Sequence, residues 1–304
     1  MHVAIIGAGA IGTMLAVRLA PMTGDLTLVA RGARLAHLRD NPLRLDSNGA
    51  VTEARVVPCA PQDLTAPVDL AILCTKTPGL PEALAMLRGK LAPGGIVLTT
   101  QNGVEAHRIA ADLLTEAAVV ASRVHGFFEM DGQLVRHVGV EPSLLYGCTR
   151  GDAATVHARI AALFAGSGIA AEPSDRIEQA LWQKFMLAAC LGGAALALGV
   201  NAGMVCQTME GEGLLAAAMH EVAALARASG IALGDADVAE ALAFVRTFPL
   251  DATTSLQRDV EGRLASEYDA LPGAVARLAQ RCGYPAQIFP RIEAMIRKRG
   301  LLPG

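Results

Sequence analysis

Short apolar runs alternate with amphipathic stretches over the first 172 residues of the chain. The runs predict buried strands at residues 3–6, 26–29, 69–74, 96–100, 118–122 and 169–171, and helical periodicity predicts helices at 15–19, 79–91 and 155–165. Asn48-Gly49 lies between two alternating segments, which predicts a β-hairpin across 43–57, and residues 127–147 are also β-rich. The pattern predicts an α/β fold with a Rossmann-type doubly wound parallel sheet, whose ligands bind at the carboxyl ends of the strands.

The pattern changes after Pro173, where convincing strand signals cease. Helices are predicted from residue 177 onward and at 212–229, 237–248, 271–282 and 288–298. We therefore expect an N-terminal domain at 1–172 and an all-helical C-terminal domain at 173–304. The uncharged segment 185–200 is shorter than the roughly 20 apolar residues that span a membrane, and its many small residues favour a buried helix.

The charge is nearly balanced, with 26 basic and 29 acidic residues among 304 and no run of like charge. This argues against nucleic acid or an anionic membrane as the main partner. The six cysteines form no C-x-x-C pair and the seven histidines no H-x-x-x-H pair, so we expect reduced thiols, no metal site and a cytoplasmic protein. Met1 leads directly into the first strand, which leaves no room for a signal peptide.

A glycine pattern between the first strand and the first helix points to a dinucleotide. The loop consists of Gly7, Ala8, Gly9, Ala10, Ile11 and Gly12, in G-x-G-x-x-G spacing. In such a loop the first glycine turns tightly, the second lets backbone approach a pyrophosphate, and the third lets the helix pack on the strand. The helix N-terminus then favours the negative charge of the pyrophosphate.

The residue after the second strand indicates which dinucleotide binds. Arg31 stands there, with Arg34 one turn on and no acid before Asp40. A guanidinium binds a 2′-phosphate through two parallel hydrogen bonds (bidentate pairing), so we predict NADP(H) as the cofactor. The alternative is a flavin or NAD site beside an incidental surface arginine.

Two polar residues directly follow predicted strands. Lys76 follows the strand 69–74 and Asn102 follows the strand 96–100, at the sheet edge where we expect the nicotinamide half of a cofactor. The alternative interpretation of Lys76 is a solvated surface lysine without a function. The alternative interpretation of Asn102-Gly103 is an ordinary turn.

Lys184 is the last charge before the most apolar segment of the chain. One interpretation is a lysine at a helix edge with its stem against apolar surface and its ammonium in water. The other is a partly desolvated ammonium in a cleft, whose lowered pKa makes it a better proton donor near neutral pH.

With these residues assembled, the chain resembles the ketopantoate reductase family of NADP-dependent 2-dehydropantoate 2-reductases over nearly its whole length. The similar segments are IIGAGAIG with Arg31, LCTK at Lys76, QNG at Asn102, LWQK at Lys184, TSLQRD at Ser255 and ASEYDAL at Glu267. Their order and spacing together are more specific than any one of them.

The resemblance implies an active site between a Rossmann domain and a helical domain, and a place in pantothenate biosynthesis. It implies that Lys184 is the general acid that protonates the ketone oxygen and that Glu267 lies near this lysine and the cofactor ribose. Ser255 is implied to bind the substrate carboxylate, and Asn102 and Lys76 to contact cofactor and substrate. The implied partner is a small 2-oxo acid, and a homodimer is left open.

Three places depart from the family pattern, and one of them is the family's Asn-Gly after the acidic motif, which reads Leu271-Pro272-Gly273 here. Ala188 and Gly192 stand one and two turns after Lys184, where the family usually has asparagines. Loss of these amides is expected to change substrate specificity more than chemistry, because they would bind a substrate hydroxyl. A related β-hydroxyacid or opine-type dehydrogenase, and a catalytically silent NADP(H)-binding protein, are the alternative functions.

Overall fold

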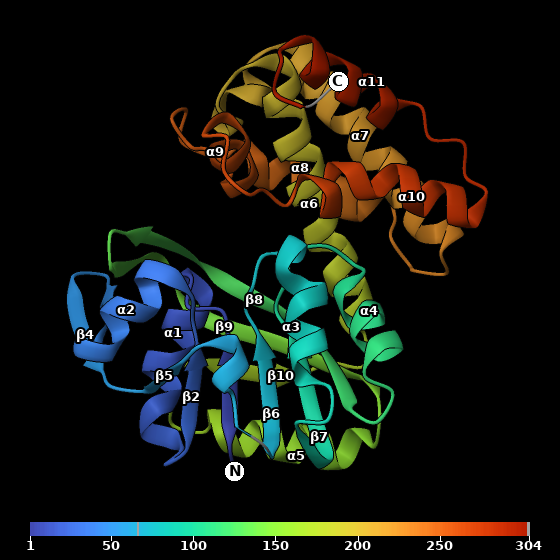
Figure 1. Ribbon diagram of the computed structural model, residues 1–304. Helices are drawn as coiled ribbons and strands as arrows, with labels where there is room; N and C mark the ends of the chain where they lie inside the picture. The colour runs from blue at the N-terminus through green and yellow to red at the C-terminus, as the bar shows by residue number, and fades with distance from the viewer. Residues whose placement is uncertain (66, 303–304) are drawn as a thin grey trace. The chain divides into compact units, whose positions relative to one another are not determined.

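The computed structural model describes residues 1–65 and 67–302, which form two units (Figure 1). The first unit contains Met1–Gln101 and Glu105–Ile177. The second begins at Glu178 and also includes the short segment Asn102–Val104. The contacts therefore divide the chain between Ile177 and Glu178, and they assign Asn102 to the second unit although it directly follows a strand of the first.

In the described part of the first unit, ten strands form one mixed sheet. They are β1 (Val3–Ile6), β2 (Leu26–Val29), β3 (Leu43–Ser47), β4 (Ala50–Ala54), β5 (Val57–Cys59), β6 (Val68–Leu73), β7 (Leu91–Thr99), β8 (Ala118–Asp131), β9 (Leu134–Arg150) and β10 (Ala170–Pro173). Their order is β4-β3-β9-β8-β7-β6-β1-β2-β5, and β10 pairs with β9. The strands β5, β2, β1, β6, β7 and β8 run parallel, which confirms the Rossmann-type prediction.

The sheet departs from a purely parallel one at two hairpins. β8 and β9 form a long antiparallel ladder, because the tight turn at Gly132 (φ 58°) leaves no room for the crossover that parallel strands need. The hairpin at Asn48-Gly49 is confirmed as β3–β4. Its second arm was predicted too long, because residues from Val57 leave it and pair with β2 instead.

Helices cover both faces of this sheet. They are α1 (Ala10–Leu19), α2 (Gly32–Asp40), α3 (Leu80–Leu87), α4 (Ala106–Leu113) and α5 (Ala153–Phe164), with 3₁₀ turns η1 (Ala20–Met22), η2 (Pro61–Asp63) and η3 (Thr77–Gly79). Val3 and Ile5 of β1 pack in a core with α1, α2 and α5, whereas Ala4 and Ile6 pack in a core with α3 and α4. Successive strand residues face opposite sides, so one strand serves both cores.

In the first unit one helix was predicted too long, and two helices, α2 and α4, were not predicted. The helix predicted to reach residue 91 ends at Leu87, since Gly89 adopts a positive φ of 69° and β7 already begins at Leu91. Helix α4 was missed because its eight residues contain only one strongly apolar pair, Ile109 and Leu113.

The described part of the second unit contains no strand, which agrees with the predicted helical domain. Its helices are α6 (Ile177–Leu198), α7 (Met209–Ala228), α8 (Asp235–Val245), α9 (Ser255–Glu261), α10 (Pro272–Cys282) and α11 (Ile288–Lys298), with 3₁₀ turns η4 (Ala202–Gln207) and η5 (Tyr268–Ala270). Helix α9 was not predicted, because it is short and mostly polar. Helix α6 is long and apolar enough to cross a membrane, yet 72% of its most apolar window is buried inside the protein.

A buried carboxylate ties α7 to α11. Glu221 of α7 is 6% exposed, and its oxygens accept hydrogen bonds from the backbone N–H groups of Gln287 (2.5 Å), Ile288 (2.9 Å) and Phe289 (2.9 Å). These groups lie at the start of α11, where N–H groups lack partners within the helix. Glu221 therefore caps a helix other than its own, and its negative charge faces the positive end of that helix.

Candidate functional site

The glycine loop after β1 excludes side chains at two positions. Gly7 has a φ of +112° and donates its N–H to Val29 O at 3.0 Å, and a Cβ on it would lie 2.9 Å from the backbone nitrogen of Thr75. A Cβ on Gly12 would lie 1.9 Å from Gly7 O. The first and third glycines are therefore required by the close packing of α1 against the ends of β1 and β6.

Gly9 behaves differently from its two neighbours in the pattern. A Cβ on it would meet no heavy atom within 4 Å, and its φ of −76° is open to any residue. The space over Gly9 is thus open at the N-terminus of α1, whose first turn contains no acidic residue. An open approach to backbone N–H groups at a helix N-terminus fits a dinucleotide pyrophosphate.

The two arginines after β2 have different partners. Arg31 pairs with Glu82 of α3 through both terminal nitrogens, at 2.8 and 2.7 Å. Arg34 is half-buried and donates to Ala8 O, Thr13 Oγ1 and the side chain of Gln133. Burial lowers the pKa of Arg34. Arg34 thus joins the glycine loop to the β8–β9 turn, whereas Arg31 pairs with one exposed carboxylate.

Gln101 holds together the carboxyl ends of β6 and β7. Its side-chain nitrogen donates to Leu73 O and Thr75 O, both at 2.9 Å. Its Oε1 and the hydroxyl of Thr75 are buried without a hydrogen-bond partner among the described residues. Such buried unpartnered atoms are costly, and they often mark functional sites. The sequence reading missed Gln101, although it directly precedes Asn102 at a strand end.

Two further side chains lie at the end of β6. Cys74 is half-buried, and desolvation of its thiol raises the pKa of this group to about 12, so the thiol stays protonated. Lys76 is exposed and is the residue before η3. The structure therefore places Lys76 at the strand end that the sequence predicted.

Asn102 and Glu267 meet in the second unit. The Nδ2 of Asn102 donates to Oε2 of Glu267 at 3.0 Å, and both residues are half-buried. The adjacent Gly103 has a φ of +104°, and a Cβ on it would lie 2.8 Å from Ala270 O. The Asn-Gly dipeptide is thus more than an ordinary turn, because its backbone packs against η5 and its amide against the residue before η5.

Lys184 lies on a half-buried stripe of α6. Its neighbours one turn on, Leu187 and Ala188, are also half-buried, whereas Trp182 and Phe185 are buried and stack edge to face at 5.6 Å. Residues three and four apart share one helix face, so Lys184, Leu187 and Ala188 form one surface. Apart from the ammonium, this surface is apolar.

Gly192 lies one turn beyond Ala188 and is covered by α9. A Cβ on Gly192 would lie 2.9 Å from Leu256 Cδ2 and 3.5 Å from Thr254 Oγ1. Thr254 caps α9 by accepting the N–H of Gln257 at 3.0 Å, and Ser255 is the exposed first residue of that helix. The contact between Leu256 and Gly192 therefore packs the start of α9 against α6, two turns after Lys184.

The sequence-predicted residues fall into two groups. The loop of residues 7–12, Arg31 and Lys76 belong to the first unit, and Asn102, Lys184, Ser255 and Glu267 belong to the second. Within the described residues, no three His, Cys, Asp or Glu side chains are grouped to hold a metal ion. Glu82 and Leu256 carried no sequence signal, because their importance comes from contacts across the fold.

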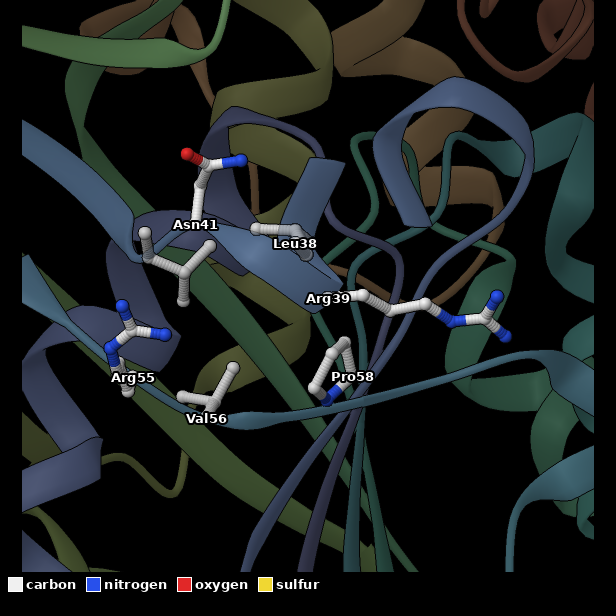
Figure 2. A pocket seen from close by; sticks show the side chains of 7 residues that line it. Leu38, Arg39, Asn41, Arg55, Val56 and Pro58 are labelled. Atoms are coloured by element: carbon white, nitrogen blue, oxygen red, sulfur yellow. The ribbon is translucent and has the colours of Figure 1, made fainter. Parts of the chain in front are cut away.

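A separate pocket of the first unit contains none of these residues. It is lined by Leu38, Arg39, Asn41, Leu43, Arg55, Val56 and Pro58 (Figure 2). These residues come from the end of α2 and the strands after it, away from the glycine loop in sequence. We therefore do not assign the chemistry to this pocket.

Two family models together match most of the chain. The family described as "Ketopantoate reductase PanE/ApbA" matches residues 3–151, and "Ketopantoate reductase PanE/ApbA C terminal" matches residues 176–299. A 2-dehydropantoate 2-reductase of Halobacterium salinarum is 26% identical over 300 residues, which cover 98% of each chain.

Solved structures agree with these matches. A PanE/ApbA family ketopantoate reductase from Ralstonia eutropha is 29% identical, covers 98% of each chain and has a TM-score of 0.88. A D-mandelate dehydrogenase in complex with NADH and anilino(oxo)acetate shares the fold, with a TM-score of 0.86 at 21% identity and 99% coverage of each chain.

The fold, the glycine loop and these matches define an oxidoreductase that acts on a ketone or alcohol group with a nicotinamide dinucleotide. The chain belongs to the ketopantoate reductase family. Several of its relatives are 2-dehydropantoate 2-reductases, and the family reduces small oxo acids with NADPH. The protein is soluble, like its biosynthetic relatives.

Proposed function

We propose that this protein reduces a small 2-oxo acid to the 2-hydroxy acid with NADPH, with 2-dehydropantoate as the first substrate to test. The observation that carries the proposal is the glycine loop. Gly7 and Gly12 have no room for a Cβ, whereas the space over Gly9 is open. This combination is what a bound pyrophosphate requires.

The cofactor is assigned to the residues that the sequence singled out for it. The loop of Gly7 to Gly12 binds the pyrophosphate, Arg31 binds the 2′-phosphate, and Lys76, Asn102 and Glu267 contact the ribose and nicotinamide half. NADPH supplies the hydride when bound. The protein's part is to fix the acceptor carbon and to stabilise charge on the ketone oxygen.

Lys184 is assigned as the general acid. Charge builds on the ketone oxygen as C2 gains the hydride, and an ammonium at that oxygen stabilises the charge and donates the proton. Lys184 then regains a proton from water. Its half-buried position beside Leu187 and Ala188 supports this role, because an ammonium stabilises a developing oxyanion more strongly where water is partly excluded.

Glu267 and Ser255 are assigned positioning and binding roles. Glu267 holds Asn102 through the 3.0 Å hydrogen bond, which orients the amide of Asn102 toward cofactor and substrate. The exposed hydroxyl of Ser255, at the N-terminus of α9, is assigned to the substrate carboxylate.

A second candidate function is reduction of an apolar 2-oxo acid. The surface beside Lys184 consists of Leu187 and Ala188, and Leu256 covers Gly192, so this surface offers no amide to a substrate hydroxyl. The D-mandelate dehydrogenase with the same fold carries a 2-oxo acid derivative with an aromatic group. An opine-type reaction would differ by consuming an amine together with the oxo acid.

The test is NADPH oxidation, followed at 340 nm, by purified protein with paired substrates. 2-Dehydropantoate is compared with 3,3-dimethyl-2-oxobutanoate, which lacks only the hydroxyl, and with benzoylformate, with and without added amine. Turnover of 2-dehydropantoate supports the first function, and turnover of the apolar acids alone supports the second. If no oxo acid is turned over although NADPH binds, the protein is a catalytically silent NADP(H)-binding protein.

Two further assignments concern the protein in the cell. We place it in the cytoplasm, in keeping with its six free cysteines, with a role in pantothenate biosynthesis if 2-dehydropantoate is the substrate. A homodimer is supported by large apolar side chains exposed on the second unit, among them Met209, Phe244 and Leu250. Sedimentation equilibrium of the purified protein decides between monomer and dimer.

A further inference from the structure

The ion pair between Arg31 and Glu82 lies at the position assigned to the 2′-phosphate. Nη1 of Arg31 donates to Oε2 of Glu82 at 2.8 Å, and Nη2 lies 2.7 Å from Oε1. The side chains are 55% and 65% exposed. Exposed ion pairs are weakly stabilising, so a ligand of higher charge can displace one.

Glu82 occupies the edge of the guanidinium that carries both terminal nitrogens. A phosphate pairs with a guanidinium either through this edge or through the edge that carries Nε. In the first case the phosphate needs the N–H groups of Nη1 and Nη2, which are already bonded to Glu82. In the second case the phosphate lies close to the carboxylate and is repelled by it. Glu82 therefore opposes a 2′-phosphate in both arrangements.

Arg34 offers no alternative site for the phosphate. Its guanidinium donates to the backbone of Ala8, the hydroxyl of Thr13 and the side chain of Gln133. Releasing Arg34 would break the link between the glycine loop and the β8–β9 turn. The 2′-phosphate and the carboxylate of Glu82 therefore compete for the guanidinium of Arg31.

We propose that Glu82 is a specificity-determining residue that lowers the affinity for dinucleotides with a 2′-phosphate relative to those without one. The proposal rests on the proposed function, in which Arg31 receives the 2′-phosphate. NADH has uncharged ribose hydroxyls at this position, and these donate to a carboxylate instead of repelling it. Glu82 therefore penalises NADPH and leaves NADH unaffected or better bound.

The experiment measures the Kd of NADPH and of NADH from the fluorescence of the reduced nicotinamide, without substrate. Glu82→Gln is expected to lower the Kd of NADPH by roughly three- to tenfold and to leave the Kd of NADH unchanged or higher. The gain is expected to shrink at high salt, since screening weakens the repulsion. Glu53→Gln is the matched control, because it removes the same charge from another exposed pair, Arg44–Glu53 at 3.2 Å.

The outcomes separate this proposal from the proposed function. An unchanged or raised Kd of NADPH in Glu82→Gln overturns the role of Glu82. A raised Kd would mean that Glu82 holds Arg31 in place for the phosphate. An equal gain in Glu53→Gln also overturns it, since the effect would then be one of net charge. The phosphate site itself fails if Arg31→Ala leaves the Kd of NADPH unchanged. The double variant Arg31→Ala/Glu82→Gln must bind NADPH no more tightly than Arg31→Ala alone.

Discussion

Asn102 and Glu267 are 165 positions apart in the chain, yet the Nδ2 of Asn102 lies 3.0 Å from Oε2 of Glu267. A charge-assisted hydrogen bond of this length fixes the amide, so that only its oxygen and one N–H remain for ligands. The segment Asn102–Val104 also groups with the second unit, which contains the assigned proton donor Lys184. This bond therefore brings two residues that the sequence nominated separately into one constellation.

Replacing Glu267 tests the pair. Glu267→Ala is expected to lower kcat/KM by roughly ten- to a hundredfold, the value of a lost hydrogen bond to a charged group, and Glu267→Gln by less, since a glutamine oxygen still accepts from Asn102. Steady-state kinetics on all variants measure the effect. Glu240→Ala, which removes an exposed carboxylate of α8, is the control. A Glu267→Ala variant within twofold of the parent would contradict the assignment.

Lys184 is tested by separating chemistry from binding. Lys184→Ala is expected to lower kcat by about 10²- to 10⁴-fold, the usual contribution of a general acid, because water then supplies the proton. The Kd of NADPH is expected to stay within about twofold, since the proposed role concerns the substrate oxygen. The control Lys298→Ala removes a lysine from the far end of α11. Strong residual turnover in Lys184→Ala would remove the lysine from the mechanism.

Gly9 and Gly12 are predicted to respond oppositely to the same substitution. Gly9→Ala meets no atom within 4 Å, so stability stays near that of the parent, but the methyl group narrows the approach to the backbone and raises the Kd of NADPH tenfold or more. Gly12→Ala puts a methyl group 1.9 Å from Gly7 O, and we expect a loss of roughly 1–3 kcal/mol in the free energy of unfolding. Urea denaturation and fluorescence titration of both variants measure the contrast. Equal behaviour of the two variants would refute this reading of the loop.

The local patterns predicted the Rossmann-type core and the helical second unit because buried strands and long helices have strong hydrophobic periodicity. The same patterns missed α9, whose seven polar-rich residues are placed by the Thr254 cap and by Leu256 packing on Gly192. They predicted a β-rich region but not one long ladder of β8 and β9, whose register shifts between His125 and Phe127 at Gly126, a residue with a φ of +126°.

The site was predictable only in its separate residues. Each of Lys76 and Asn102 stands at a strand end, which local sequence shows. The partners of these and other site residues are distant in sequence, as with Arg31 and Glu82 or Asn102 and Glu267, so no local pattern encodes them. Tertiary contacts decide which predicted residues meet.

The cap of α11 gives a stability prediction that is independent of the active site. Glu221→Ala leaves three N–H groups without an acceptor, and we expect a loss of about 3 kcal/mol in the free energy of unfolding, the larger part of it from desolvation of those groups. Glu221→Gln keeps one accepting oxygen and is expected to lose less. Urea denaturation followed by circular dichroism measures both, with Glu240→Ala as the exposed control. A loss below 1 kcal/mol in Glu221→Ala would show that water replaces the carboxylate.

The apolar surface beside Lys184 is predicted to affect how the protein distinguishes substrates with a hydroxyl from substrates without one. Ala188 offers no hydrogen bond to the hydroxyl of 2-dehydropantoate, so we expect the parent to prefer this acid over 3,3-dimethyl-2-oxobutanoate by less than a variant with an amide at position 188 does. Ala188→Asn places an amide one turn from Lys184, on the same half-buried face. One net hydrogen bond is worth about 1 kcal/mol, so the variant should favour the hydroxylated acid roughly fivefold more than the parent does.

Position 192 is not equivalent to position 188. Gly192→Asn must displace Leu256, whose Cδ2 lies 2.9 Å from the position of the new Cβ, and Leu256 is 2% exposed. We expect Gly192→Asn to lower stability and to shift α9 with Ser255, and therefore to raise KM for both acids alike because their carboxylates are identical. A preference for the hydroxylated acid that appears with Gly192→Asn and not with Ala188→Asn would mean that the substrate chain extends toward α9. In that case the wall that reads the hydroxyl would be built around Gly192, and the packing of Leu256 would have to open to admit it.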